Sequence, residues 1–293
     1  MFEAIILTAV LGAAFGLILA FAGKYLYKET DPRVSAVSAL LPGANCGACG
    51  YPGCAAMAEH IVSGKADRTA CAVADANTQK QIAAIINQKI SETEPVYAKL
   101  AVLSCNGCAG NIPQSAVYHG PADCRMAIKL LAAPGKCSYG CYGFGSCVQA
   151  CPFGAITIGA HGLPQINTGK CTGCGMCVKT CPQHVLKLTP RDSALRLLCS
   201  NHDNAKTAMA ACKASCIGCG LCVRTCPNGA ITLKDNLPAI DYTKCTGCGL
   251  CTQKCPRGCL VLAAPPENSL PINALPQNKG CAACPLAENC GIK

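Results

Sequence analysis

The chain lacks tryptophan altogether, and tyrosine and phenylalanine bring the aromatic share of its 293 residues to only 4%. Because aromatic side chains bury large apolar surfaces, their scarcity predicts thin hydrophobic cores that need another source of stability, such as bound metal. The sequence also contains no Lys/Arg run and no nucleic-acid recognition motif. We therefore expect no nucleic-acid binding, although the formal net charge is +10.

Motifs for several other kinds of chemistry are absent as well. Gly143 and Gly145 form a Gly-x-Gly without the longer nucleotide-binding pattern, and the sequence has no P-loop, HExxH or nucleophile elbow. We expect no catalytic residue and no site for NAD or flavin in this chain. Any hydride-transfer step would belong to a partner.

Cysteine is the residue that the chain has in excess, with 29 copies. This density is typical of a disulfide scaffold or of a metal carrier, and the cellular compartment separates the two. The N-terminus, MFEAII, has no basic region of the kind that opens a secretory signal. Residues 4–22 form a run of 19 residues without a charge, which as a helix would match a bilayer core of about 30 Å.

This run predicts a single, uncleaved N-terminal transmembrane helix. Lys24, Lys28 and Arg33 follow it, whereas only Glu3 precedes it. By the positive-inside rule the long remainder lies in the cytoplasm, so we expect a single-pass protein of the inner (cytoplasmic) membrane. The reducing cytoplasm favours metal thiolates over disulfides.

The spacing of the cysteines indicates the metal. In the bacterial ferredoxin motif, Cys-x2-Cys-x2-Cys-x3-Cys-Pro, three thiolates hold one [4Fe-4S] cluster and the fourth holds the neighbouring cluster. Three complete copies occur, ending at Pro182, Pro227 and Pro256. Zinc sites more often combine one cysteine pair with a distant second pair, so the pattern favours iron–sulfur.

Cross-ligation assigns clusters to these motifs. We expect three complete sets of ligands. The first consists of Cys171, Cys174 and Cys177 with Cys151; the second, of Cys245, Cys248 and Cys251 with Cys226; and the third, of Cys216, Cys219 and Cys222 with Cys255. The remaining ligands, Cys141, Cys147 and Cys181, are one short, because position 144 is Phe. An oxidised cluster with four thiolates carries about −2 charge, so five clusters would offset the positive excess.

Two interpretations of the missing ligand stay open. In the one that we favour, Cys137 supplies it, because the flexible YGFG segment around Phe144 lets the loop fold inward. In the other, Cys137 joins Cys105, Cys108 and Cys124 in a separate four-cysteine site, and a three-ligand cluster remains.

An internal repeat sharpens this choice. A constant offset of 75 positions relates Cys124, Cys137, Cys141, Cys147 and Cys151 to Cys199, Cys212, Cys216, Cys222 and Cys226. Cys212 precedes a complete motif that needs no substitute ligand. The cysteine at this repeated position, 137 or 212, therefore has a role or an evolutionary origin that does not depend on the missing cysteine at position 144. The conservative interpretation makes Cys105, Cys108, Cys124, Cys199 and Cys212 buried or spare thiols, and Cys281, Cys284 and Cys290 thiols of a mobile tail.

These patterns predict an α+β chain in which short hairpins and short helices surround the metal loops. Its expected parts are a membrane anchor over 1–28, an N-terminal [4Fe-4S] module over 29–95, a connector with a candidate extra cluster site over 96–136, ferredoxin-like domains over 137–190 and 191–263, and a Pro-rich tail with a cysteine motif over 264–293.

The order of these parts resembles a known family. An apolar N-terminal run, the segment PGANCGACGYPGC closed by a distant Cys, and CSYGCYGFGSCVQACPFGAI followed by CTGCGMCVKTCP are similar to the RnfB component of the Rnf electron-transport complex, in a long form with an additional ferredoxin pair. The resemblance implies that Cys46, Cys49, Cys54 and Cys71 hold the first cluster, which brings the expected total to at least five [4Fe-4S] clusters.

The resemblance also implies a function and partners. In this family, RnfB relays electrons between soluble ferredoxin and the other subunits, which include integral membrane subunits and a flavin/NADH subunit, and the complex couples ferredoxin/NAD redox chemistry to Na⁺ or H⁺ translocation. One alternative is a membrane-tethered polyferredoxin that donates electrons to a corrinoid protein or a dehydrogenase. A second is a structural zinc or metal-storage protein.

Overall fold

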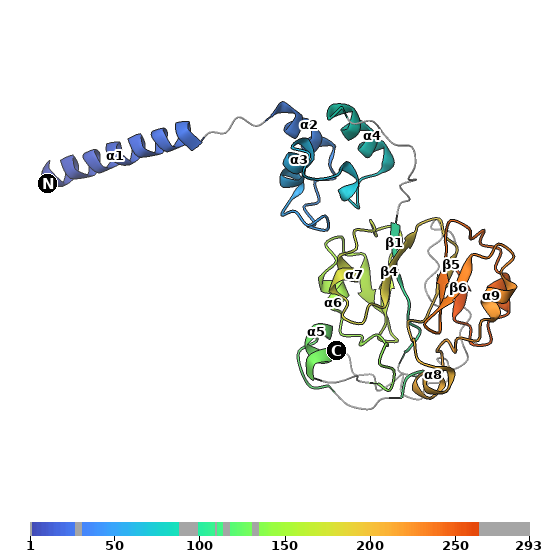
Figure 1. Ribbon diagram of the computed structural model, residues 1–293. Coiled ribbons are helices and arrows are strands. Elements are labelled where there is room, and N and C mark those ends of the chain that lie inside the picture. The colour runs from blue at the N-terminus through green and yellow to red at the C-terminus, as the bar shows by residue number, and fades with distance from the viewer. Residues whose placement is uncertain are drawn as a thin grey trace. The chain divides into compact units, whose positions relative to one another are not determined.

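The computed structural model describes residues 2–26, 31–87, 99–108, 110–113, 118–130 and 135–263. The tail over 264–293, with Cys281, Cys284 and Cys290, lies outside the described residues. The chain forms two compact units (Figure 1). The first comprises Met1–Asn45, Tyr51–Ala70 and Asn77–Ile90, and the second comprises Cys46–Gly50, Cys71–Ala76 and Ser91–Lys293.

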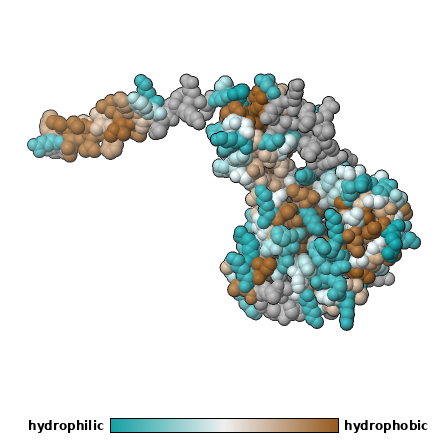
Figure 2. All heavy atoms as spheres, viewed as in Figure 1, coloured by the Kyte–Doolittle hydropathy of each residue, from teal (hydrophilic) through white to brown (hydrophobic). Residues whose placement is uncertain are grey.

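The charge-free N-terminal run forms helix α1 (Phe2–Leu26). The side chains whose exposure the structure describes are mostly exposed and hydrophobic, as the brown colour in Figure 2 shows; Leu17 and Leu19 are 65% and 70% exposed. Among the residues that the structure describes, however, no helix combines the length and the apolarity that crossing a membrane requires. The prediction of a single N-terminal transmembrane helix is therefore wrong. The charge-free run correctly indicates a helix. To span a membrane, however, a helix must also be sufficiently apolar over the whole thickness of the bilayer core.

The rest of the first unit is helical. It contains α2 (Pro32–Leu40), α3 (Cys54–Val62), the 3₁₀ turn η1 (Arg68–Ala70) and α4 (Ala76–Ile85). Asp31 caps α2, because its side chain accepts a hydrogen bond from the Arg33 amide at 2.9 Å. The largest buried side chains of these helices, Met57, Ile61 and Ile82, are aliphatic or thioether groups. The core of this unit is therefore a conventional apolar one.

The second unit contains two copies of one fold. The first copy consists of β1 (Lys99–Leu103), α6 (Ser146–Gln149), β2 (Ile156–Ile158), β3 (Pro164–Ile166), α7 (Met176–Thr180) and β4 (Leu186–Pro190). The second consists of β5 (Leu195–Leu197), α9 (Leu221–Thr225), β6 (Ile231–Lys234), β7 (Leu237–Ile240), α10 (Leu250–Gln253) and β8 (Leu260–Leu262). Helices α5 (Cys124–Leu130) and α8 (Ala205–Ala211) follow the first strand of their copies.

Each copy has one short hairpin and one long-range strand pair, and all four pairs are antiparallel. The hairpins β2–β3 and β6–β7 follow the expected pattern of strand, turn and strand. In the second hairpin, Asp235 and Asn236 take φ values of 46° and 60°, as a type I′ turn requires. The long-range pairs are β1–β4, with Leu103 opposite Leu186, and β5–β8, with Leu197 opposite Leu260. The second pair of each copy therefore brings together its first and last strands.

The core of each copy consists of aliphatic side chains and thiols together. In the first copy, Leu100, Ile156 and Leu186 pack with cysteines of the metal loops. In the second, Leu195, Leu197, Ile231, Leu237 and Leu260 do the same. Aromatic side chains are absent from both groups as far as the described residues extend. These thin cores agree with the low aromatic content, and they place the cysteines at the centre of each fold.

Candidate metal centres

The metal loops take their shape from glycines. In the loop that begins at Cys171, Gly173 and Gly175 have φ values of 71° and 80°, a region that residues with a Cβ rarely adopt. Gly175 is also the N-cap of α7. The loop can therefore curl around its own cysteines and enter the next helix within a few residues. Glycine is likewise the N-cap of α6, α9 and α10, again with a positive φ.

Gly173→Ala tests this geometry. A Cβ at Gly173 would overlap the carbonyl oxygen of Lys99 in β1, and the positive φ adds strain. We expect a destabilisation of about 2–4 kcal/mol and a loss of about four iron atoms per chain from the loop that follows Cys171. Thermal unfolding and iron content measure both effects. Gly154→Ala is the matched control, because Gly154 has φ +57° but nothing within 4 Å of its added Cβ. If both variants lose iron equally, backbone strain rather than the contact with β1 is responsible.

The second copy has two pockets that are lined by cysteines. The first is lined by Cys226, Cys245, Cys248 and Cys251, and the second by Cys216, Cys219, Cys222, Cys255 and Cys259. In the first pocket Cys226, the last cysteine of one motif, joins three cysteines of the other motif, and in the second pocket Cys255 does the same. The structure therefore brings together the two sets of four cysteines that cross-ligation assigned to this copy.

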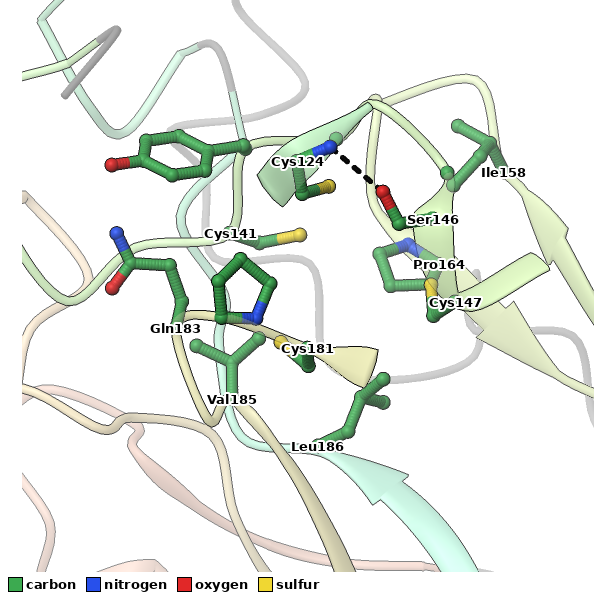
Figure 3. Close-up of a pocket in the computed structure, with 14 residues that line it drawn as sticks. Cys124, Cys141, Ser146, Cys147, Ile158, Pro164, Cys181, Gln183, Val185 and Leu186 are labelled. Atoms are coloured by element: carbon green, nitrogen blue, oxygen red, sulfur yellow. Dashed lines mark hydrogen bonds between the residues drawn. The ribbon is translucent and has the colours of Figure 1, made fainter. Parts of the chain in front are cut away.

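The corresponding pocket of the first copy is lined by four cysteines. Figure 3 shows their sulfur atoms turned toward one shared space. They are Cys124, Cys141, Cys147 and Cys181. Cys137, which the favoured interpretation placed here, does not line this pocket; Cys124, which that interpretation left aside, does. Cys108, which the other interpretation grouped with Cys137, is buried and does not line it either.

Ser146 explains why Cys124 reaches this pocket. The Cys124 amide at the start of α5 donates to Ser146 Oγ at 2.7 Å, and the Ser146 hydroxyl donates to Asp123 at 3.2 Å. Ser146 is only 3% exposed and immediately precedes Cys147. The ring of Phe144 packs against Tyr118, with ring centroids 4.9 Å apart. The segment between β1 and Cys137 is thus attached to the incomplete motif at two points. The signal available in the sequence was Ser146 itself, because the other motifs have Met176, Leu221 and Leu250 at this position.

The other set of the first copy lies in the same core. Cys171 and Cys177 are buried in it, and Cys151 packs against it. The Cys177 thiol interacts electrostatically with Cys171, Cys174 and Cys151. The Cys151 sulfur also accepts the Ala155 amide at 3.3 Å. All four cysteines assigned to this set by cross-ligation therefore lie close together.

Burial favours the protonated form of several of these thiols. It raises the pKa of Cys147 and Cys222 to about 11 and that of Cys177 to about 12. Bound iron would supply the positive charge that stabilises the thiolates. Within the described ranges, no three or more His, Cys, Asp or Glu side chains form a group that could hold a metal ion as they stand.

Cys259 is a residue that the motif analysis did not single out. Its amide donates to the Cys255 sulfur at 3.3 Å, as the amides of Ala155 and Ala230 donate to Cys151 and Cys226 at the same distance. Cys259 therefore occupies the position of an alanine in the equivalent loops. Its thiol hydrogen-bonds to Cys255 and lowers the pKa of Cys255 to about 5, because the bond stabilises the thiolate.

The cysteines of the N-terminal module lie at the ends of local elements. Cys46 and Cys49 lie in the loop before α3, Cys54 is the first residue of α3, and Cys71 follows η1. The Cys54 amide donates to the Asn45 side chain at 2.8 Å. This stretch lies within residues 41–73, which match the protein family described as "Putative Fe-S cluster".

Two further family matches fall on the two copies. Residues 164–187 match "4Fe-4S binding domain", and residues 215–259 match "4Fe-4S dicluster domain". The second match covers all the cysteines that line the two pockets of the second copy. The three matches together support [4Fe-4S] clusters as the cofactors of this chain.

Curated relatives extend this likeness over most of the chain. The RnfB component of the Na(+)-translocating ferredoxin:NAD(+) oxidoreductase complex of Acetobacterium woodii is 41% identical over 235 residues, which are 80% of this chain and 70% of that protein. The chain belongs to this RnfB family. The counterpart in the ion-translocating oxidoreductase complex of Methanosarcina acetivorans is 39% identical and covers 83% of this chain and 90% of its own length. The counterpart in the proton-translocating complex of Clostridium ljungdahlii is 39% identical over 81% of this chain and 83% of its own. Membership confirms the predicted resemblance.

Proposed function

We propose that this chain is the iron–sulfur electron-transfer subunit of an ion-translocating ferredoxin:NAD(+) oxidoreductase complex. The observation that carries the proposal is the arrangement of cysteines around separate pockets in two ferredoxin-like copies. Membership of the RnfB family supports it. The corrinoid and metal-storage alternatives have no comparable support.

The proposed ligands form five sets of four. They are Cys46, Cys49, Cys54 and Cys71; Cys124, Cys141, Cys147 and Cys181; Cys151, Cys171, Cys174 and Cys177; Cys216, Cys219, Cys222 and Cys255; and Cys226, Cys245, Cys248 and Cys251. Each set would hold one [4Fe-4S] cluster, which exchanges one electron at a time. The protein supplies thiolates, amide hydrogen bonds to sulfur and an apolar surround, and these adjust the cluster potentials.

The partners follow from the family. The relatives' names describe ferredoxin and NAD(+) as the substrates of an ion-translocating complex. We infer that this chain accepts electrons from, or returns them to, soluble ferredoxin, and passes them to subunits that carry out hydride transfer. Because ion translocation takes place across a membrane, we place the chain in a membrane-associated complex.

The test is electron transfer from ferredoxin to the full-length chain. Anaerobically purified protein should contain iron and acid-labile sulfide in equal amounts, and reduced ferredoxin should bleach its visible absorbance and produce the EPR signals of reduced [4Fe-4S] clusters. The chain stripped of iron is the control and should give neither response. A colourless, zinc-rich protein, or an iron-loaded chain that reduced ferredoxin leaves oxidised, would contradict the proposal.

A further inference from the structure

A second group of four thiols lies outside these five sets: Cys105, Cys137, Cys199 and Cys212. Each of the four interacts electrostatically with the other three. Cys137, Cys199 and Cys212 are 8%, 7% and 5% exposed. All four are free thiols. Thiols separated by up to 107 residues thus meet at one place in the second unit.

The two copies contribute to this group in the same way. Cys105 follows the end of β1 by two residues, and Cys199 follows the end of β5 by two. The Cys105 sulfur accepts the amide of Cys141 at 3.5 Å, and the Cys199 sulfur accepts the amide of Cys216 at 3.3 Å. The Cys105 sulfur also accepts a hydrogen bond from the Gly107 amide at 3.4 Å, and the Cys199 sulfur accepts one from the Asn201 amide at 3.5 Å. The structural counterpart of Cys199 is therefore Cys105, not Cys124.

Cys137 and Cys212 complete the symmetry. They are related by the 75-residue offset and pack in one apolar group with Ile112. The Asn201 side chain in the second copy reaches the Cys137 sulfur in the first, at 3.8 Å. The copies also meet beside this group, because the Ser200 hydroxyl donates to the Ser104 carbonyl at 2.9 Å. Each copy thus supplies one thiol after its first strand and one before its first metal loop.

The surroundings of these thiols resemble those of the proposed ligands. Amide hydrogen bonds to sulfur, of the kind that Cys151, Cys226 and Cys255 accept at 3.3 Å, are also made to Cys105 and Cys199. Four thiolates are the ligand set that a [4Fe-4S] cluster requires.

We propose that Cys105, Cys137, Cys199 and Cys212 bind a further [4Fe-4S] cluster, which the two ferredoxin-like copies hold jointly. This proposal rests on the proposed function, because it assumes that the chain carries iron–sulfur clusters. Cys141 and Cys216, whose amides contact this group, are proposed ligands of one cluster in each copy. The shared cluster would pass single electrons between the copies: a reduced neighbour loses one electron, the shared cluster gains it, and no bond or proton is exchanged.

Native mass spectrometry of the full-length, anaerobically purified chain tests the proposal. We expect the unsubstituted chain to carry six clusters rather than five, and Cys212→Ala and Cys105→Ala each to carry one fewer. The control is Ser200→Ala, which removes another buried side chain beside this group but takes away no thiol. This control should retain all six.

The outcomes separate the two proposals. A fully loaded chain with five clusters, or a Cys212→Ala variant with as many clusters as the unsubstituted chain, overturns the shared cluster and leaves the proposed function standing. A chain that binds no iron–sulfur cluster overturns both. If Cys212→Ala fails to fold, the number of clusters in the unsubstituted chain still decides the proposal, because six clusters support it and five overturn it.

Discussion

Cys124→Ala should remove one [4Fe-4S] cluster, or about four iron and four sulfide per chain. The reason is geometric: Cys124 lines the first-copy pocket with Cys141, Cys147 and Cys181. With only three thiolates left, the cluster would lack a ligand at one corner and lose iron. Iron and sulfide analysis, with EPR of the reduced protein, measures the loss.

A second substitution makes this prediction specific. Phe144 stands at the motif position that Cys219 holds in the second copy, where Cys219 lines the pocket. Cys124→Ala combined with Phe144→Cys should therefore regain the lost iron. Cys137→Ala should also lose about four iron, from the proposed shared cluster, but Phe144→Cys should not restore them. If Phe144→Cys rescued Cys137→Ala and not Cys124→Ala, the missing ligand would be Cys137 after all.

Removal of the clusters should unfold both ferredoxin-like copies. Their cores contain buried thiols beside the aliphatic side chains of β1, β4, β5 and β8. Without iron, the cysteine-lined pockets would be left unfilled in cores that, within the described ranges, have no large aromatic residue to fill them. Metal binding and folding are then one equilibrium, as in other small metal-dependent domains.

Hydrogen exchange followed by mass spectrometry can measure this effect by region. After treatment with a chelator and an oxidant, we expect the amides of Leu186 in β4 and Leu260 in β8 to lose their protection, and reconstitution with iron and sulfide to restore it. The core around Met57 and Ile82 is aliphatic, and α4 contains no proposed ligand, so α4 serves as the internal reference and should lose less. Protection of β4 and β8 that survives iron removal would show that the copies fold without clusters.

The sequence predicted the local parts of this protein well. The sequence could predict the ferredoxin motifs, the hairpins β2–β3 and β6–β7 and the family. These features are local: the cysteines and glycines that define a metal loop lie within about ten residues of one another. The transmembrane helix was predicted wrongly, since a charge-free run indicates a helix without establishing a span. The sequence favoured Cys137 as the fourth ligand of the incomplete motif, whereas Cys124 lines that pocket; residue spacing alone gave no reason to choose Cys124.

The sequence by itself thus determined which cysteines belong to ferredoxin motifs and that the motifs occur in two copies. The tertiary structure decided which thiols outside the motifs meet them. Cys124 lines its pocket through a hydrogen bond to Ser146, which lies 22 residues further along the chain. Cys105 and Cys199 lie where the two copies meet, each next to one end of the hydrogen bond from the Ser200 hydroxyl to the Ser104 carbonyl. Contacts between residues that are far apart along the chain depend on how the segments and the two copies pack. The spacing of residues in the sequence does not show that packing.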